Sequence, residues 1–135
     1  SGGLSAATQA EMEAATSNTV AATPGRTQNH PGVAKAWVTF TPPDTTIDES
    51  YNVTSVTDNA TGEFTINFTT AFATAFYDAQ MSNRPTANST AVHVYEDSSA
   101  NQTRTTTALR IFCATDHTGT SGDPELVSID FHGDQ

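Results

Sequence analysis

The chain has 135 residues, the size of one domain, and only 36% of them are hydrophobic, which is fewer than in an average globular chain. Its formal net charge is −10, and its five basic residues are scattered along the sequence at Arg26, Lys35, Arg84, Arg104 and Arg110. Nucleic acids and anionic membranes are bound through clustered Lys and Arg, so this pattern argues against both partners. Threonine occurs 25 times and favours strands.

The N-terminal stretch predicts a short helix that needs support from elsewhere. Thr8 and Glu11 have the spacing of a capping box, in which each side chain caps the backbone of the other residue. The helix runs from there to about Thr16 and is too short to be stable alone in water. Turn-forming residues follow, with a break at Thr23-Pro24-Gly25.

We divide the chain into a neck, residues 1–32, and a head, residues 33–135. Seven segments of the head alternate as half-buried strands do. The clearest is 63–69, which pairs with 51–57 across a five-residue turn in which Gly62 is free to adopt a positive φ. The others are 33–40, 75–82, 91–96, 106–115 and 125–132. This pattern predicts an all-β fold, an antiparallel β-sandwich of about seven strands.

No recognised catalytic motif is present in the sequence. The single cysteine, Cys113, is expected to be a small buried hydrophobe. Asp116-His117 and the pair Asp130 and His132 are residue types that bind metals, but we interpret them as a solvated loop and a strand-end pair. The sequence therefore predicts no enzyme, no cofactor and no metal.

Residues 7–26 read ATQAEMEAATSNTVAATPGR and contain an A-T-x-A-E-x-x-A-x-T run that ends in T-P-x-R. The matched residues are Ala7, Thr8, Ala10, Glu11, Ala14, Thr16, Thr23, Pro24 and Arg26. This segment resembles one found in many tail-fibre and related host-recognition proteins of tailed bacteriophages. Such segments usually have Gly where Ala15 stands, and AVTP where this chain has AATP. Residues 30–37 and 50–72 also resemble the C-terminal domains of such proteins.

The resemblance implies a trimeric virion component at the tip of a tail fibre, acting outside the cell and without enzymatic activity. In that arrangement the neck helix packs around a threefold axis through Ala10, Met12 and Ala14. The alternative for this segment is a disordered leader. The head is then expected to bind a host surface structure, a carbohydrate or another outer-membrane receptor. Two alternatives are a monomeric bacterial carbohydrate-binding or adhesin module and a structural decoration or assembly domain of a virion.

Counting strands from the neck assigns each connection to one end of the head, since antiparallel strands alternate in direction. Seven strands place connections 41–50, 70–74 and 97–105 at the distal tip. Connections 58–62, 83–90 and 116–124 then face the fibre. Loops on a rigid scaffold often carry binding, and the polar side chains of the tip suit sugar hydroxyls. The expected receptor-binding residues are Asp44, Asp48, Asp97, Asn101, Gln102 and Arg104.

Overall fold

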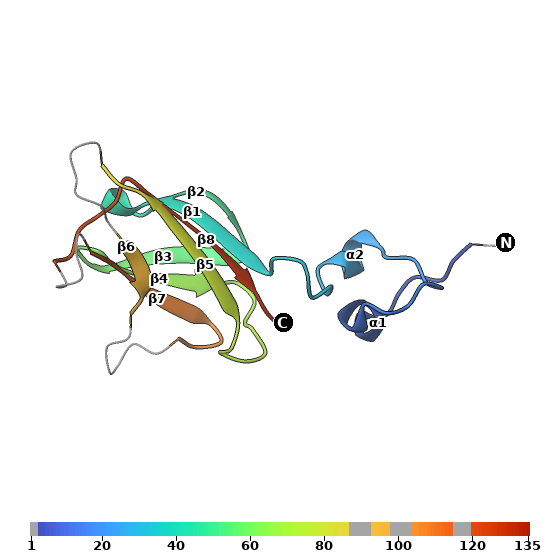
Figure 1. Ribbon diagram of the computed structural model, residues 1–135. Coiled ribbons are helices and arrows are strands. Elements are labelled where there is room, and N and C mark those ends of the chain that lie inside the picture. The colour runs from blue at the N-terminus through green and yellow to red at the C-terminus, as the bar shows by residue number, and fades with distance from the viewer. Residues whose placement is uncertain (1–2, 87–92, 98–103, 115–119) are drawn as a thin grey trace.

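The computed structural model describes residues 3–86, 93–97, 104–114 and 120–135. Within these residues the chain forms a small N-terminal neck followed by a head of two facing sheets (Figure 1). The neck holds helices α1 (Gln9–Ala14) and α2 (Pro24–Thr27). The strands of the head are β1 (Ala36–Thr41), β2 (Thr46–Tyr51), β3 (Val53–Ala60), β4 (Glu63–Phe68), β5 (Asp78–Arg84), β6 (His93–Glu96), β7 (Ala108–Ala114) and β8 (Leu126–His132).

One sheet has the strand order β2-β1-β8-β5 and the other has the order β3-β4-β7-β6. Every neighbouring pair of strands is antiparallel. The predicted all-β antiparallel sandwich is therefore confirmed, with eight strands among the described residues in place of about seven. No helix among the described residues has the length and apolar character needed to cross a membrane.

The additional strand is β2, which the sequence analysis assigned to a connection. After β1 the chain makes a short 3-10 turn at Pro42–Asp44 and returns along β1 as an edge strand. Only Ile47 of this strand is partly buried, and it packs against the core, whereas the other five residues are exposed. An edge strand with one side chain on the core has no alternating apolar pattern, so periodicity does not detect it.

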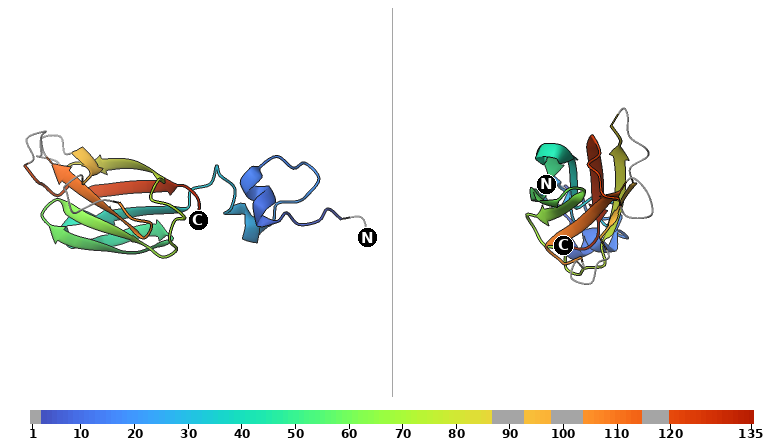
Figure 2. Two further views of the ribbon diagram at one scale, coloured as in Figure 1. Left: turned by 90° about the horizontal axis from the view of Figure 1, so that it is seen from below. Right: turned by 90° about the vertical axis from the view of Figure 1, so that its left-hand side faces the viewer.

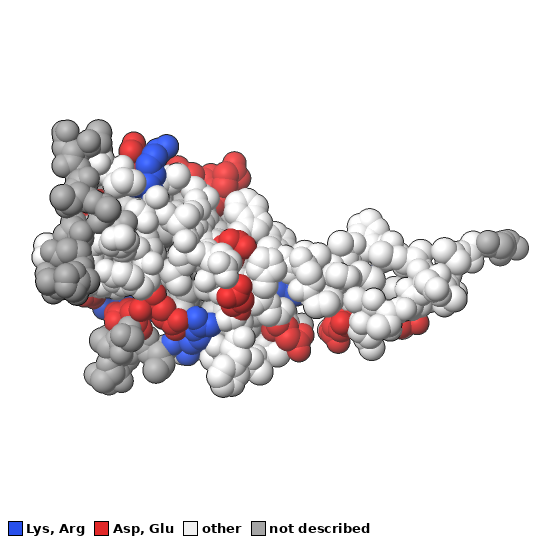
Figure 3. Space-filling model, in the orientation of Figure 1, with Lys and Arg blue, Asp and Glu red and all other residues white. Residues whose placement is uncertain are grey.

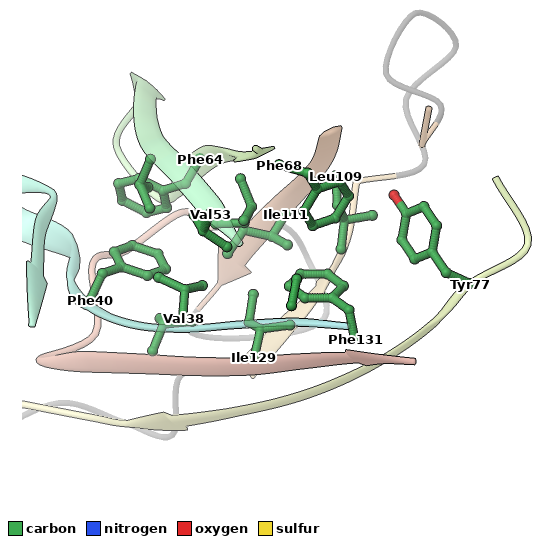
Figure 4. Close-up of a cluster of buried hydrophobic side chains, with 14 of the residues drawn as sticks. Val38, Phe40, Val53, Phe64, Phe68, Tyr77, Leu109, Ile111, Ile129 and Phe131 are labelled. Atoms are coloured by element: carbon green, nitrogen blue, oxygen red, sulfur yellow. The ribbon is translucent and has the colours of Figure 1, made fainter. Parts of the chain in front are cut away.

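The space between the sheets is filled by aliphatic and aromatic side chains from both (Figure 4). Phe40 and Phe64 meet edge to face across the sheets, with ring centroids 5.5 Å apart. Toward the neck, Phe68 lies at the centre of a second aromatic group, with Tyr77 and Phe131 around it. Cys113 is a free thiol in this core, as expected, and burial raises its pKa to about 12.

The predicted hairpin is formed by β3 and β4, although its turn is shorter than expected. Pairing continues to Ala60 and Glu63, past an irregularity after Asp58, so that only two residues make the turn. Gly62 has a φ of +76°, and a Cβ there would lie 2.5 Å from the carbonyl oxygen of Cys113. Glycine is required at this position by both the backbone angle and the close approach.

The capping box of α1 is confirmed: the Thr8 amide donates to the Glu11 carboxylate at 2.9 Å, and the Glu11 amide donates to the Thr8 hydroxyl. The helix ends at Ala14, before the expected Thr16, because Ala15 adopts a left-handed conformation with a φ of 53°. Similar segments usually have Gly at this position, and glycine is the residue that this conformation favours. The expected break at Thr23-Pro24-Gly25 contains the start of a single helical turn, α2, in which Thr23 is the N-cap and Pro24 the first residue, a position that proline favours.

Candidate functional site

The two ends of the head are defined by where the neck joins it. β1 begins directly after Lys35, whose ammonium donates to the neck carbonyls of Gln28 and His30. Since neighbouring strands are antiparallel, β1, β3, β5 and β7 run away from the neck, and β2, β4, β6 and β8 run back toward it. The chain end after β8 accordingly lies beside the neck (Figure 2).

This direction of the strands overturns most of the expected division into distal and neck-facing connections. The unrecognised strand β2 shifts the count by one, so the connections that follow β3, β5 and β7 start at the distal pole. The connections that follow β2 and β4 start on the side of the neck, whereas β6 ends opposite Ile111, in the middle of β7. Of the three segments predicted at the distal tip, the first part of 41–50 lies there and 70–74 does not, while most of 97–105 lies outside the described residues.

Asp44 lies in the distal turn between β1 and β2, as predicted. Its carboxylate accepts from the Thr46 amide at 3.1 Å, and hydrogen bonds from Thr46 lower the pKa of this exposed group. Asp48 lies on β2 next to the same turn and accepts from the Thr41 hydroxyl at 3.1 Å. Both carboxylates are exposed and retain acceptor capacity for a ligand at the distal pole.

Asp97 lies beside Arg110, near the middle of β7, and Arg104 lies beside Tyr77, just before β5; both have structural partners. Asp97 lies 3.1 Å from Arg110 Nε, and its side chain is only 12% exposed. Arg104 is bound to both carboxylate oxygens of Glu96, donates to the Tyr77 carbonyl and lies over the Tyr77 ring. Neither residue lies in a distal turn, and their role in receptor binding stays a prediction. The other two predicted residues, Asn101 and Gln102, lie outside the described residues.

The neck residues predicted at a threefold axis differ in whether their side chains are exposed to a second copy of the chain. Ala10 and Ala14 are exposed on α1 and are free to contact a copy of the chain. Met12 is 8% exposed and therefore already buried within its own chain, so its assignment to a contact between copies is corrected. It is buried because the neck closes on itself, with backbone pairing between residues 5–7 and Ala21.

The neck and the head share a pocket of about 530 Å³ that the sequence analysis did not predict. It is lined by Glu13, Gln28, Asn29, Pro31, Lys35, Tyr51, Asn52, Thr70, Gly133, Asp134 and Gln135. Lys35 is only 4% exposed, and this burial lowers the pKa of its ammonium, while Asp134 and Glu13 oppose the shift. Residues 33–40 were predicted as one strand, but β1 begins after Lys35.

Asn52 is the residue between β2 and β3, at the end of the head that adjoins the neck. It has a positive φ of 55°, and its side-chain amide donates to the Lys35 carbonyl at 3.0 Å. Its side-chain oxygen accepts from the Thr70 amide at 2.7 Å. Lys35, Tyr51 and Asn52 in this pocket are therefore hydrogen-bonded within the chain itself.

Among the described residues, no three His, Cys, Asp or Glu side chains gather as a possible metal site. Asp130 and His132 do lie together at the end of β8, with the carboxylate oxygen 3.6 Å from Nδ1 of the ring. Asp116 and His117 lie outside the described residues.

Basic side chains are largely neutralised within the chain. Arg84 pairs with Glu125 at 3.1 Å, Arg104 with Glu96, and Arg110 with Glu63 and Asp97. The visible face is accordingly acidic along its length, and its larger basic groups adjoin acidic ones (Figure 3). The charged groups on this face are therefore mainly carboxylates.

No protein-family model, curated protein or solved structure matches this chain. The sequence resemblance and the geometry of the described residues are therefore the observations that bear on its function.

Proposed function

We propose that the chain is the head of a bacteriophage tail-fibre-type protein, which assembles as a homotrimer through its neck and binds a host-surface receptor at its distal pole. The receptor is most simply a carbohydrate, and binding involves no catalytic step. The observation that carries the proposal is the polarity of the molecule. The neck and the last strand end at one pole, and among the described residues the turns between β1 and β2 and between β3 and β4 lie at the opposite pole (Figure 1).

The neck supports the trimeric part of the proposal. Its helix has six residues, a capping box and two exposed alanines on one face, at Ala10 and Ala14. A helix this short gains stability from packing rather than from its own hydrogen bonds. Small side chains permit the close approach of helices that a threefold axis requires.

Sedimentation of residues 1–135 tests the assembly. We expect a trimer at micromolar concentration, and we expect Ala10→Glu to weaken it, since this change puts three carboxylates at the axis. The control is Thr19→Glu, at an exposed neck position outside the helix. A stable monomer under these conditions contradicts the trimer.

Receptor binding is tested with the fluorescently labelled chain and a panel of bacterial cells and their purified lipopolysaccharides. We expect a double change in the distal turn, Asp44→Ala with Thr45→Gly, to reduce binding to cells. A change on the neck side of the head, Phe76→Ser, should have no effect on binding; Phe76 is exposed in the connection after β4. The distal site is contradicted if Phe76→Ser reduces binding and the double change in the distal turn does not. Binding to no cell or lipopolysaccharide also contradicts it.

A monomeric carbohydrate-binding module is the second candidate, and one observation favours it. The neck is folded within a single chain, with Met12 buried and a backbone bridge between Ala6 and Ala21, so it does not need a copy to form. Sedimentation as a monomer together with glycan binding would select this candidate.

A further inference from the structure

The outer face of the β2-β1-β8-β5 sheet carries an aromatic and polar row that the proposed function does not use. The strand registers place Tyr51 opposite Trp37, Trp37 opposite Asp130, and Asp130 opposite Gln80. The four side chains therefore stand next to one another across all four strands on one face of the sheet. Trp37 is 36% exposed and Tyr51 is 44% exposed, which leaves part of each ring open to solvent.

The adjoining row is polar and lies against the same groove. Here the register aligns Glu49, Thr39, Ser128 and Ser82, and the hydroxyls of Thr39 and Ser128 are 3.0 Å apart. A groove of about 260 Å³ runs over β1, β8 and β5, and its lining includes Trp37, Gln80, Asp130 and Ser128. It combines one aromatic surface with carboxylate, amide and hydroxyl groups.

We propose that this groove is a carbohydrate-binding site, at which one sugar ring lies on Trp37 and its hydroxyls donate to Asp130 and bond to Gln80. A pyranose presents C–H groups on one face and hydroxyls around its edge. An exposed indole flanked by polar groups offers an apolar surface and a polar border in the same arrangement. A carboxylate accepts hydrogen bonds from two hydroxyls at once.

The negative charge of this sheet face determines which class of ligand it can bind. Glu49, Asp78 and Asp130 lie on it, with His132 near Asp130, whereas the nearest arginine on this face, Arg84, is paired with Glu125. A second copy of the chain offers few unpaired cations to such a surface, because its other arginines in the head are also ion-paired. Like charges oppose an acidic polysaccharide for the same reason. A neutral or amino sugar suits the face best.

Trp37 is the only tryptophan of the chain, so its fluorescence reports on this groove alone. The probes are the methyl glycosides of glucose, galactose, N-acetylglucosamine and glucosamine, with methyl galacturonate as the acidic counterpart. For a single sugar ring on an open groove we expect a saturable change in emission with a Kd on the order of 1 mM. Galacturonate should bind more weakly than galactose.

The matched variants are Asp130→Asn, which removes the charge in the groove, and Asp58→Asn, which removes an exposed carboxylate on β3 of the other sheet. We expect the first to weaken binding by about tenfold, as the loss of a charged hydrogen bond does, and the second to leave it unchanged. Trp37→Thr removes the reporter, so transfer of nuclear magnetisation from the protein to the sugar C–H groups is measured instead and should disappear.

The following results overturn the proposal. These are no emission change with any neutral or amino sugar, magnetisation transfer that persists in Trp37→Thr, or emission that depends on protein concentration alone, which assigns the face to self-association. Choline is included as a probe because a cation can also bind an aromatic ring, and binding of choline without sugars likewise overturns it. The inference shares the ligand class of the proposed function but uses a different surface. Loss of cell binding on changing the distal turn, with sugar binding to Trp37 intact, separates the two.

Discussion

Replacing Arg104 by alanine should destabilise the head rather than abolish a receptor contact. Its guanidinium binds Glu96 through Nε, at 2.8 Å, and through a second nitrogen. It also donates to the Tyr77 carbonyl and lies 4.8 Å from the centre of the Tyr77 ring. These contacts join the β6–β7 connection to Tyr77, just before β5. β5 and β6 are edge strands of the two facing sheets.

The expected loss in the free energy of unfolding follows from these three contacts. The Arg104 and Glu96 side chains are 26% and 34% exposed, so solvent reduces the ion pair to about 0.5–1 kcal/mol. The hydrogen bond from a charged donor to the carbonyl contributes about 1.5 kcal/mol, and the contact with the ring about 0.5–1 kcal/mol. Because the contacts share one side chain and are not additive, we expect the free energy of unfolding to fall by about 2–3 kcal/mol.

Urea unfolding followed by Trp37 fluorescence measures this loss. With a slope of about 2 kcal/mol per molar for a domain of this size, the midpoint should fall by about 1–1.5 M. The urea midpoint of Arg104→Lys should lie between those of the wild type and Arg104→Ala, since lysine keeps the charge but loses the planar fork. Arg26→Ala, at an exposed neck position, is the control and should not move the midpoint.

The pH dependence gives a second measure of the same contact. Hydrogen bonding to Arg104 lowers the pKa of Glu96 below its ordinary value of 4.5. A lowered carboxyl pKa contributes stability that is complete above the unfolded pKa and is lost as the pH falls through the folded pKa. The difference between wild type and Arg104→Ala should therefore be full at pH 7 and shrink below about pH 4.5. An unchanged midpoint together with lost cell binding would refute this structural role.

Three further predictions concern backbone and core. Gly62→Ala should lower the free energy of unfolding by more than about 2 kcal/mol, since its Cβ would lie 2.5 Å from a carbonyl oxygen; Thr61→Ala is the control, and equal melting temperatures contradict the prediction. The Cys113 thiol, whose pKa burial raises to about 12, should resist a thiol-specific disulfide reagent at pH 8 until urea unfolds the head, and a fast reaction of the folded chain would show that it is accessible. Ala15→Gly should stabilise the end of α1 by about 1 kcal/mol, seen as about fivefold slower hydrogen exchange at the Met12 amide, and faster exchange would count against the left-handed cap.

Local patterns predicted the parts of the fold in which neighbours in sequence determine the structure. The β3–β4 hairpin, the capping box at Thr8 and the burial of Cys113 belong to this class. β2 was not predicted because an edge strand needs only backbone partners and one buried side chain, here Ile47. This single omission reversed the assignment of most connections to the two poles.

The candidate sites were harder to predict because distant segments assemble them. The junction pocket joins Gln28, Lys35 and Asp134, and no spacing in the sequence relates these three residues. The row of Tyr51, Trp37, Asp130 and Gln80 depends on the registers of four strands, which alternation alone does not fix. Sequence analysis identified Asp44 as distal only because the turn after β1 precedes the missed strand.

The exposed acidic edge formed by β2 has a consequence for solubility at high local concentration. A sheet edge offers unpaired backbone groups to which a strand of another molecule can add, and this is a common route to aggregation. β2 presents Asp48 and Glu49 along its length and is interrupted by a register shift opposite Thr39 and Phe40. Two such edges carry like charges and do not align, which disfavours pairing between the β2 edges of two molecules.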